Sequence, residues 1–361
     1  MKINDIADII NVTEKDPATS GIDIFVGLEH YDIAEPVIKR FGSTKMLSTA
    51  AKKFETGDVL IARRNVYLQR ASVARFAGLT SGDSIVLRVK KDLDIKGTDY
   101  DNMCALIPFI LNSINFWDYA NTNADGTMSK RLSPAMLLDY EFTLPSLAEQ
   151  KVLAEKLWAA YEVKQSYLKM IAATEEMVKA RFIEMFDFHE LNLNSPSKDF
   201  ESMCFDDTSS ATKIPAGDYL QEGKYAIYDQ AQEKVIAGYY DNEQGLCRNY
   251  PAILFGDHSR VVKYIKEPFF IGADGVKIIR PKVDNLTPEF LYYDLKYHNI
   301  PNTGYNRHFK YIKMLRLTKA SLEDQSRFLS IAHQADKSIS ELRKSVDAID
   351  KVIKSLINEN L

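Results

Sequence analysis

The sequence repeats one long helical segment, and this repeat constrains the fold more than any other feature. "SLAEQKVLAEKL" begins at Ser146, and "SLEDQSRFLSIA" begins at Ser321, 175 positions later. From Phe328 onward, apolar residues recur at alternating steps of four and three, which predicts a helix packed along its length against another helix. The first segment keeps this register, although Lys164 and other polar residues interrupt it. The seam residues are Leu153, Leu157, Tyr167, Ile171 and Val178 in the first helix, and Phe328, Ala332, Ile339, Leu342, Val346, Ile349 and Ile353 in the second.

Both segments also begin in the same way. Ser146 precedes Glu149 by three positions, which is the spacing of a helix-capping box. Ser321 stands in the same relation to Asp324. At about 1.5 Å per residue, a helix over 149–185 is roughly 55 Å long and exceeds the width of a small domain. Two such helices are expected to pair through their seams, and the simplest interpretation is that they buttress two domains.

The blocks between these helices have a different sequence pattern. Short apolar, β-branched runs alternate with Gly, Asp and Asn turns, which is typical of β-strands. The clearest runs lie at 21–28, 57–64 and 83–90 in the first block, and at 223–230, 250–259 and 274–281 in the second. Each block then offers a short helix, at 102–114 or 287–297, and a basic loop with a return strand, at 126–145 or 302–319. The sequence therefore predicts four segments, at 1–145, 146–186, 187–318 and 319–361.

The sequence lacks the common motifs of catalysis. It contains no GxxxxGK[ST] phosphate loop, no GxGxxG, no GxSxG and no HExxH. The cysteines Cys104, Cys204 and Cys247 form no CxxC pair and no zinc quartet, and their small number fits a reducing cytosol. There is no signal-peptide pattern and no apolar run of about 18 residues, so we expect a cytoplasmic protein away from membranes. These absences favour a binding protein without a cofactor or metal over an enzyme.

The candidate binding residues lie in basic loops that also carry aromatic and amide side chains. The net charge of −4 argues against nucleic acid covering the whole chain, but it permits a local basic surface. Arginine can pair with guanine, asparagine or glutamine with adenine, and tyrosine can stack or contact phosphate. The candidates are Arg63, Arg64, Tyr67, Gln69, Arg70, Lys130 and Arg131 in the first block, and Lys224, Tyr228, Gln230, His258, Ser259, Arg260, Tyr305, Asn306, Arg307, His308 and Lys310 in the second. For one loop alone a solvated basic surface is the simpler interpretation, but two blocks with matching loops favour nucleic acid.

These segments resemble a known family. "GDVLIARRNVYLQRASVARFAGLTSGDSIVLRVK" at 57–90 resembles a target-recognition domain of the specificity subunits of type I restriction-modification systems, the HsdS family. The segments at 219–230 and 250–281 resemble the same domain. The "LP" that precedes "SLAEQKVLAEKL" resembles the family's passage from a recognition domain into its spacer helix. The resemblance covers nearly the whole chain.

The resemblance implies a fold class and a set of partners. The fold is α+β, with two mixed α/β target-recognition domains alternating with two long spacer helices packed as an antiparallel coiled coil. Each recognition domain reads one half of a bipartite site in double-stranded DNA. The spacer helices hold the domains apart and dock two methyltransferase (modification) subunits, and motor-nuclease restriction subunits join that core. The specificity subunit itself catalyses nothing.

The resemblance also leads to a hypothesis about individual residues. Helix length sets the gap between the half-sites, and the loops determine the bases. At the first half-site we expect Arg63, Arg64, Gln69 and Arg70, with Lys130 and Arg131 nearer phosphate. At the second half-site we expect His258, Ser259, Arg260, Asn306, Arg307 and Lys310.

Two other interpretations stay open on the sequence. The chain could be a coiled-coil scaffold whose globular domains bind protein rather than DNA. It could also be an enzyme that uses the "GDHSR" loop at 256–260, with Asp257 and His258 as a catalytic pair. Neighbouring residues on a strand point in opposite directions, so such a pair requires a loop.

Overall fold

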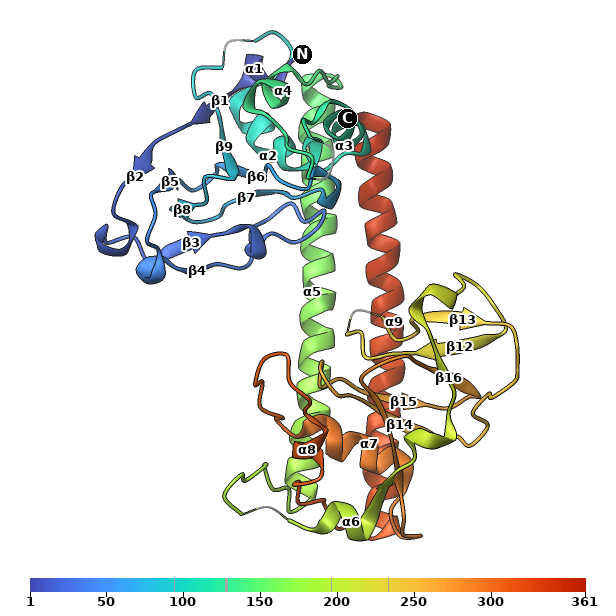
Figure 1. The fold of residues 1–361 in the computed structure, drawn as a ribbon. Helices are drawn as coiled ribbons and strands as arrows, with labels where there is room; N and C mark the ends of the chain where they lie inside the picture. Colours follow the sequence, from blue (N-terminus) through green and yellow to red (C-terminus); the bar gives the residue numbers. More distant parts are fainter. Residues whose placement is uncertain (94, 127–128, 196, 233) are drawn as a thin grey trace. The chain divides into compact units, whose positions relative to one another are not determined.

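The computed structural model describes residues 1–93, 95–126, 129–195, 197–232 and 234–361 (Figure 1). The chain divides into two compact units. The first unit comprises Met1–Leu168 together with Arg343–Leu361, and the second comprises Lys169–Leu342. These compact units separate within the long helices. The finer division into four segments, with boundaries at 146, 187 and 319, remains a prediction.

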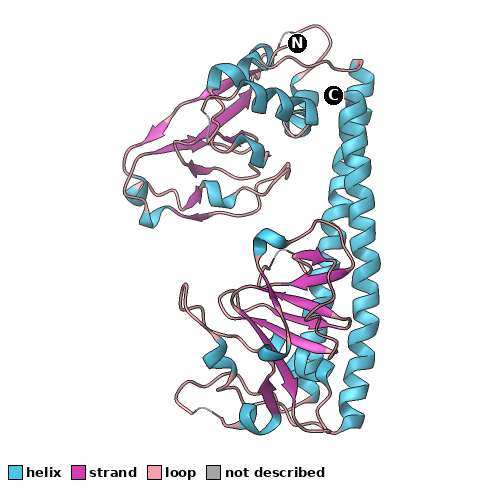
Figure 2. Cartoon of the chain, turned by 45° about the vertical axis from the view of Figure 1, so that its right-hand side comes forward, coloured by secondary structure: helices cyan, strands magenta, loops and turns pink. Residues whose placement is uncertain are grey.

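Two helices of 39 residues each contribute to both units. They are α5 (Leu147–Met185) and α9 (Leu322–Asn360), and both are drawn as unbroken coils in Figures 1 and 2. Their starts show the two halves of a capping box. Before α5, the Ser146 backbone N–H donates to the Glu149 carboxylate at 2.9 Å. Before α9, the Ser321 hydroxyl oxygen instead accepts the backbone N–H of Asp324 at 3.1 Å.

The helices pack against each other in opposite directions within each unit. In the first unit, Leu153 and Leu157 near the start of α5 share a core with Ile357 near the end of α9. In the second unit, Phe182 near the end of α5 contacts Phe328 near the start of α9, with ring centroids 5.0 Å apart. The predicted antiparallel pairing is therefore present in both units. The buried seam residues are Leu153, Leu157, Ile171, Val178, Phe328, Ala332, Ile339 and Val346, whereas Tyr167, Leu342, Ile349 and Ile353 are half-buried.

One interruption of the apolar register has a clear physical basis. Lys164 occupies a seam position in α5, and its Nζ lies 2.6 Å from Oδ1 of Asp350 in α9. The Lys164 side chain is four-fifths buried, so the ion pair satisfies a charge that the seam would otherwise leave without a partner.

The first unit contains two sheets. One sheet has the strand order β1 (Ala7–Ile10), β9 (Ser84–Val89), β6 (Val59–Ala62) and β7 (Ala71–Val73). The other has the order β2 (Thr13–Glu14), β5 (Ala51–Phe54), β8 (Gly78–Thr80), β3 (Ile24–Val26) and β4 (Gly42–Ser43). Buried residues of the first sheet pack on α2 (Tyr100–Ile110), α3 (Ile114–Asn123) and the start of α5.

The second unit repeats this plan. Its first sheet has the order β10 (Cys204–Asp206), β17 (Val276–Pro281), β14 (Ala252–Gly256) and β15 (Val262–Ile265), which corresponds strand by strand to β1, β9, β6 and β7. Its second sheet has the order β11 (Lys213–Ile214), β16 (Phe269–Gly272), β12 (Tyr225–Tyr228) and β13 (Gly238–Tyr240). Helix α7 (Pro288–Tyr297) follows β17 as α2 follows β9. The sequence repeat is thus a repeat of whole units.

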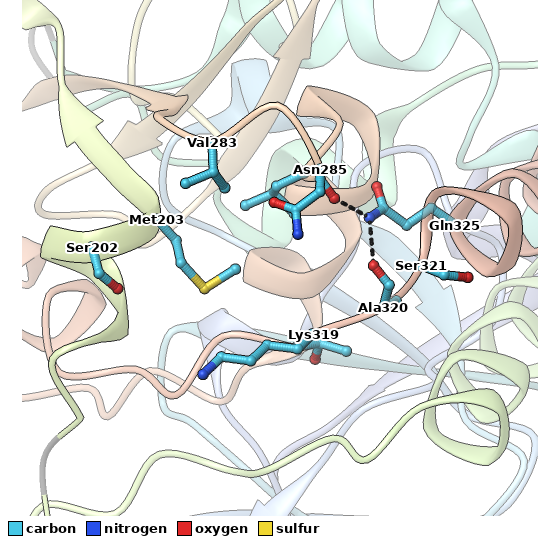
Figure 3. A pocket seen from close by; sticks show the side chains of 10 residues that line it. Ser202, Met203, Val283, Asn285, Lys319, Ala320, Ser321 and Gln325 are labelled. Atoms are coloured by element: carbon cyan, nitrogen blue, oxygen red, sulfur yellow. Dashed lines mark hydrogen bonds between the residues drawn. The ribbon is translucent and has the colours of Figure 1, made fainter.

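A buried glutamine links the first turn of each long helix to a neighbouring loop. The Gln325 side-chain N–H groups donate to the carbonyls of Asn285 at 2.7 Å and Ala320 at 3.0 Å, beside a pocket of about 610 Å³ (Figure 3). Its amide oxygen accepts the hydroxyl of Thr287, the residue that caps α7. The equivalent Gln150 makes the same three kinds of bond ahead of α2, to Gly97, Pro145 and Thr98.

The two predicted return strands are wrong. In the described part of 126–145 the chain forms the short helix α4 (Pro134–Asp139), and in 302–319 it forms α8 (Phe309–Ile312). Pro134 suits the first turn of a helix, and the Ser133 hydroxyl accepts the backbone N–H of Met136 to cap it. Between α4 and α5, where every residue is described, the backbone makes a single isolated antiparallel bridge, between Glu141 and Lys2, and no strand is formed. Buried side chains such as Phe142 and Leu317 also hold the two segments in place.

Candidate functional site

In the first unit, three loops meet at the end of β6. Arg63 is the first residue after this strand, and it donates its backbone N–H to the carbonyl of Asp83 at 2.9 Å. Its own carbonyl accepts the backbone N–H of Leu132 at 3.0 Å. These bonds join the loop after β6, the turn between β8 and β9, and the loop before α4. We call the arrangement of Arg63, Asp83 and Leu132 the first junction.

The second unit contains the same arrangement at the end of β14, and we call it the second junction. Asp257 is the first residue after this strand, and it donates its backbone N–H to the carbonyl of Gly275 at 2.6 Å. Its carbonyl accepts the backbone N–H of His308 at 2.8 Å. Gly275 and His308 therefore correspond to Asp83 and Leu132. The two units share this backbone but carry different side chains on it.

Two arginines converge on one carboxylate at the first junction. Oδ2 of Asp83 lies 2.8 Å from Nε of Arg64, and Oδ1 lies 2.8 Å from a terminal nitrogen of Arg131. About half of the Arg64 side chain and two fifths of the Arg131 side chain are exposed. The cluster therefore presents two oriented guanidinium groups to solvent.

Two further cations surround this cluster. The Arg63 side chain is half-buried, and its Nε donates to the Leu132 carbonyl at 3.2 Å. Lys52, on strand β5, donates its Nζ to the carbonyl of Ser84 at 2.9 Å. Burial and the nearby Arg63 hold the pKa of Lys52 below its ordinary value, while Asp83 opposes them. The surface of the first junction thus carries more positive than negative charge.

Two predicted contact residues of the first unit instead bind the loops together. Arg70 donates to the carbonyls of Leu28 at 3.1 Å and Arg64 at 2.9 Å, and burial lowers its pKa. Lys130 donates its Nζ to the carbonyl of Asn121 at 2.5 Å. Since both cations are occupied by backbone oxygens, they support the shape of the junction.

The remaining candidates of the first unit lie in a tightly bent loop. Asn65 and Gln69 have φ angles of 54° and 50°, the left-handed conformation that asparagine tolerates better than most residues. They flank a single turn of 3₁₀ helix at Val66–Leu68. Tyr67 stands at the centre of this turn with 62% of its surface exposed. The bend places an exposed tyrosine between two sharply turned residues.

An exposed aromatic stack marks the second junction. The rings of His258 and Tyr305 lie parallel, with centroids 4.6 Å apart and 6° between their planes. Tyr305 is 90% exposed. The His258 backbone N–H donates to the side-chain oxygen of Gln230 at 3.1 Å, and its ring Nδ1 lies 3.2 Å from the carbonyl oxygen of Asn306. Two other segments, around Gln230 and around Asn306, therefore hold the histidine that supports the tyrosine.

Cationic side chains extend the surface of the second junction. Arg307 and Lys310 are both exposed. Arg260 is half-buried, and a terminal nitrogen of its guanidinium donates to the carbonyl of Ile300 at 3.1 Å. Ser259 is half-buried in the same turn. Of these four candidates, Arg307 and Lys310 are the ones that face solvent most openly.

Two other candidates of the second unit are buried, and a third lies beside β12. Tyr228 is buried, its hydroxyl donates to Glu267 at 2.6 Å, and burial raises its pKa. His308 is fully buried, with its ring Nδ1 2.9 Å from the carbonyl oxygen of Asp257. Lys224 is exposed but precedes β12, where its Nζ lies 5.1 Å from the centre of a neighbouring tyrosine ring. We therefore carry none of the three into the proposed contact set.

Two residues at the junctions, Asp83 and Lys52, are not among the sequence candidates. Asp83 lies in "SGDS", which looks like an ordinary turn. Lys52 comes from a strand of the other sheet, so only the folded chain brings it to the cluster.

The structure does not support a catalytic pair in the "GDHSR" loop. The carboxylate of Asp257 is buried and accepts the backbone N–H of Phe309 at 2.7 Å. The ring of His258 faces Asn306 and Tyr305 instead. Among the described residues, no group of three or more His, Cys, Asp or Glu side chains is placed to hold a metal ion. Within the same residues, no helix combines the length and apolar character that crossing a membrane requires.

Among the comparisons with known proteins, only the one with solved structures finds a match, and it shows a shared fold. No protein-family model matches the sequence, and no curated protein matches it either. A crystal structure of the S subunit of a type I restriction-modification system from M. genitalium is similar, with a TM-score of 0.51 and 15% identity over 99% of this chain and 94% of that one.

A second solved structure gives the same result. It comes from work on complex assembly and conformational transition of a type I restriction-modification system. Its TM-score is 0.50, with 15% identity over 99% of this chain and 95% of the other. Likeness at this identity establishes a shared architecture. The chain therefore has the fold of the S subunits of type I restriction-modification systems.

Proposed function

We propose that this chain is the DNA specificity subunit of a type I restriction-modification complex, and that it catalyses no reaction itself. The observation that carries the proposal is the junction that occurs once in each unit. One backbone scaffold presents arginines in the first unit and a histidine–tyrosine stack with cations in the second. Two similar binding surfaces with different side chains suit a DNA site that has two different halves.

The exposed side chains of the two junctions offer different chemical groups to DNA. Arg64 and Arg131 have free N–H groups that can contact guanine in the major groove. At the second junction, Asn306 offers an amide next to Tyr305, and Arg307 and Lys310 offer charge to bases or phosphates. Each unit thus combines base-reading groups with phosphate-binding groups.

The long helices offer surfaces for the partner subunits. Along α5, four exposed apolar residues fall on one face because their spacing is eleven, seven and seven: Val152, Val163, Met170 and Met177. We propose that methyltransferase subunits dock on the helices and that restriction subunits join through them, in the cytoplasm. The rival scaffold that binds only protein is not favoured, because the structural neighbours come from type I restriction-modification systems.

The experiment is a selection from random DNA duplexes by the chain co-purified with its methyltransferase subunit. We expect a bipartite motif whose binding weakens steeply as salt rises, since phosphate contacts release counterions. Exchanging Arg64 and Arg131 for alanine should degrade one half of the motif, and exchanging Asn306 and Arg307 should degrade the other. Recovery of no motif, or of a motif that all four changes degrade equally, would contradict the proposal.

A further inference from the structure

The first junction contains an acidic side chain where a DNA-binding surface would ordinarily exclude one. Asp83 lies among Lys52, Arg63, Arg64 and Arg131, and three quarters of its side chain is buried. A carboxylate repels DNA phosphates, so its presence lowers the general affinity of this surface. We therefore expect Asp83 to have a second role that offsets this loss of affinity.

Its contacts indicate that role. Asp83 binds the Nε of Arg64 with one oxygen and a terminal nitrogen of Arg131 with the other, both at 2.8 Å. A free arginine side chain loses rotamer entropy on binding, and a bound carboxylate fixes its plane beforehand. Among the described residues, no hydrogen bond engages a terminal nitrogen of Arg64, so both are available to a ligand. Two terminal nitrogens form the fork that pairs with O6 and N7 of guanine.

We propose that Asp83 is a positioning residue that makes the first unit require a guanine, by holding Arg64 and Arg131 in orientations suited to that base. The inference rests on the proposed function. Asp83 acts through the arginines and does not itself contact the DNA. A glutamine or asparagine pairing with adenine would need no such carboxylate, which is why the geometry points to guanine.

This role predicts two opposite effects of removing the charge. Affinity for random DNA should rise, because a phosphate-repelling charge is gone. Preference for guanine at one or two positions of one half-site should fall by roughly 5- to 100-fold, the range that a bidentate arginine contact contributes. A carboxylate that only stabilised the loops would instead change affinity for every sequence in the same direction.

The experiment compares Asp83→Ala and Asp83→Asn with wild type in the full chain bound to its methyltransferase subunit. The backbone bonds of Asp83 to Arg63 and Ser81 do not involve the carboxylate, so the junction can persist in both variants. Asp32→Ala is the matched control, since Asp32 pairs with Arg40 at 2.7 Å elsewhere in the same unit. The readouts are the selected motif, affinity for random duplex and thermal unfolding.

The expected result is weaker guanine preference with stronger random binding in both Asp83 variants, at the positions that Arg64→Ala also affects, and an unchanged motif in the control. An unchanged motif in both Asp83 variants would overturn the inference while leaving the proposed function intact. A uniform loss of affinity on all sequences together with lower thermal stability would overturn it too. If wild type selects no motif, the proposed function itself fails.

Discussion

Gln150 and Gln325 show what a single buried side chain contributes to this chain. Each is almost completely buried, and each uses its amide hydrogens and its oxygen within one unit. Each therefore ties the first turn of a long helix to the loop that precedes a shorter helix. A buried amide left without partners is costly, so such residues specify one position of the helix rather than several.

Gln325→Ala should lower the free energy of unfolding of the second unit by about 2 kcal/mol, because it leaves the carbonyls of Asn285 and Ala320 without their donor. Urea denaturation of the full chain measures this loss. Gln334→Ala, at an exposed position of the same helix, is the control and should change stability by less than about 0.5 kcal/mol. Equal effects of the two changes would contradict the structural role of Gln325.

Tyr305→Ala should weaken binding to the second half-site by about 1 kcal/mol, the scale of one aromatic contact. The ring is 90% exposed and stacks on His258, so thermal stability should stay close to that of wild type. Binding to duplexes with single changes in each half-site measures the effect. A loss of binding to the first half-site instead would contradict the placement of Tyr305 at the second.

Cys204 should react slowly with iodoacetamide at pH 8 in the folded chain. It is buried, and burial raises its pKa to about 12, so very little of the reactive thiolate is present at that pH. Mass spectrometry of alkylated peptides, with urea-unfolded protein as the reference, measures the rate. Rapid labelling of Cys204 in the folded chain would show that this strand opens readily.

Residue type and position in the sequence identified the junction loops but did not orient their side chains. His308 and Arg307 are neighbours in one basic loop, yet one is buried and the other exposed. Their directions depend on Asp257, which binds the loop from another segment. Contacts between distant segments of this kind leave no periodic pattern in a sequence, and the same holds for Lys52 beside Arg63.

Among the elements, the long helices carry the clearest relation between sequence and packing. Phe182 of α5 has five aromatic neighbours within the second unit, with ring centroids 5.0 to 5.7 Å away. Phe328 of α9 is one of them. The heptad spacing predicted that the helices pair, because it depends on local periodicity alone. It did not predict the aromatic cluster, which also draws on α7.

Phe182→Ala should lower the free energy of unfolding by about 3–5 kcal/mol, since it leaves a cavity in a cluster of rings. Ile183→Ala is the matched control, because Ile183 is the next residue of α5 and is 45% exposed. Hydrogen exchange should increase mainly within residues 169–342. A small loss of stability, similar to that of the control, would show that the cluster repacks.

The short elements were harder to predict than the long ones. The sequence analysis predicts a return strand before each long helix. Pro134 with its serine cap instead begins α4, and Phe309 begins α8. In segments this short, one capping bond and one buried contact decide between helix and strand, and hydrophobic periodicity reports neither.

For the molecule as a whole, the continuity of α5 and α9 from one unit into the other leads to a test of spacing. Inserting seven residues into both helices, after Leu168 and after Leu342, preserves the heptad register and lengthens each by about 10.5 Å. If helix length sets the gap between half-sites, the selected motif should gain about three base pairs in its centre. An insertion in α5 alone is the control, and it should disrupt the pairing. An unchanged gap after the double insertion would refute the role of the helices as spacers.

The division into units also bears on the order in which the chain can fold during synthesis. The second unit is one uninterrupted stretch, so all of its parts are synthesised before Arg343. The first unit draws Ile357 and Leu361 into the core that contains Leu153. Although it begins to emerge earlier, its core is completed later, and a polypeptide cut short before Arg343 would present that unfinished apolar surface to chaperones and proteases.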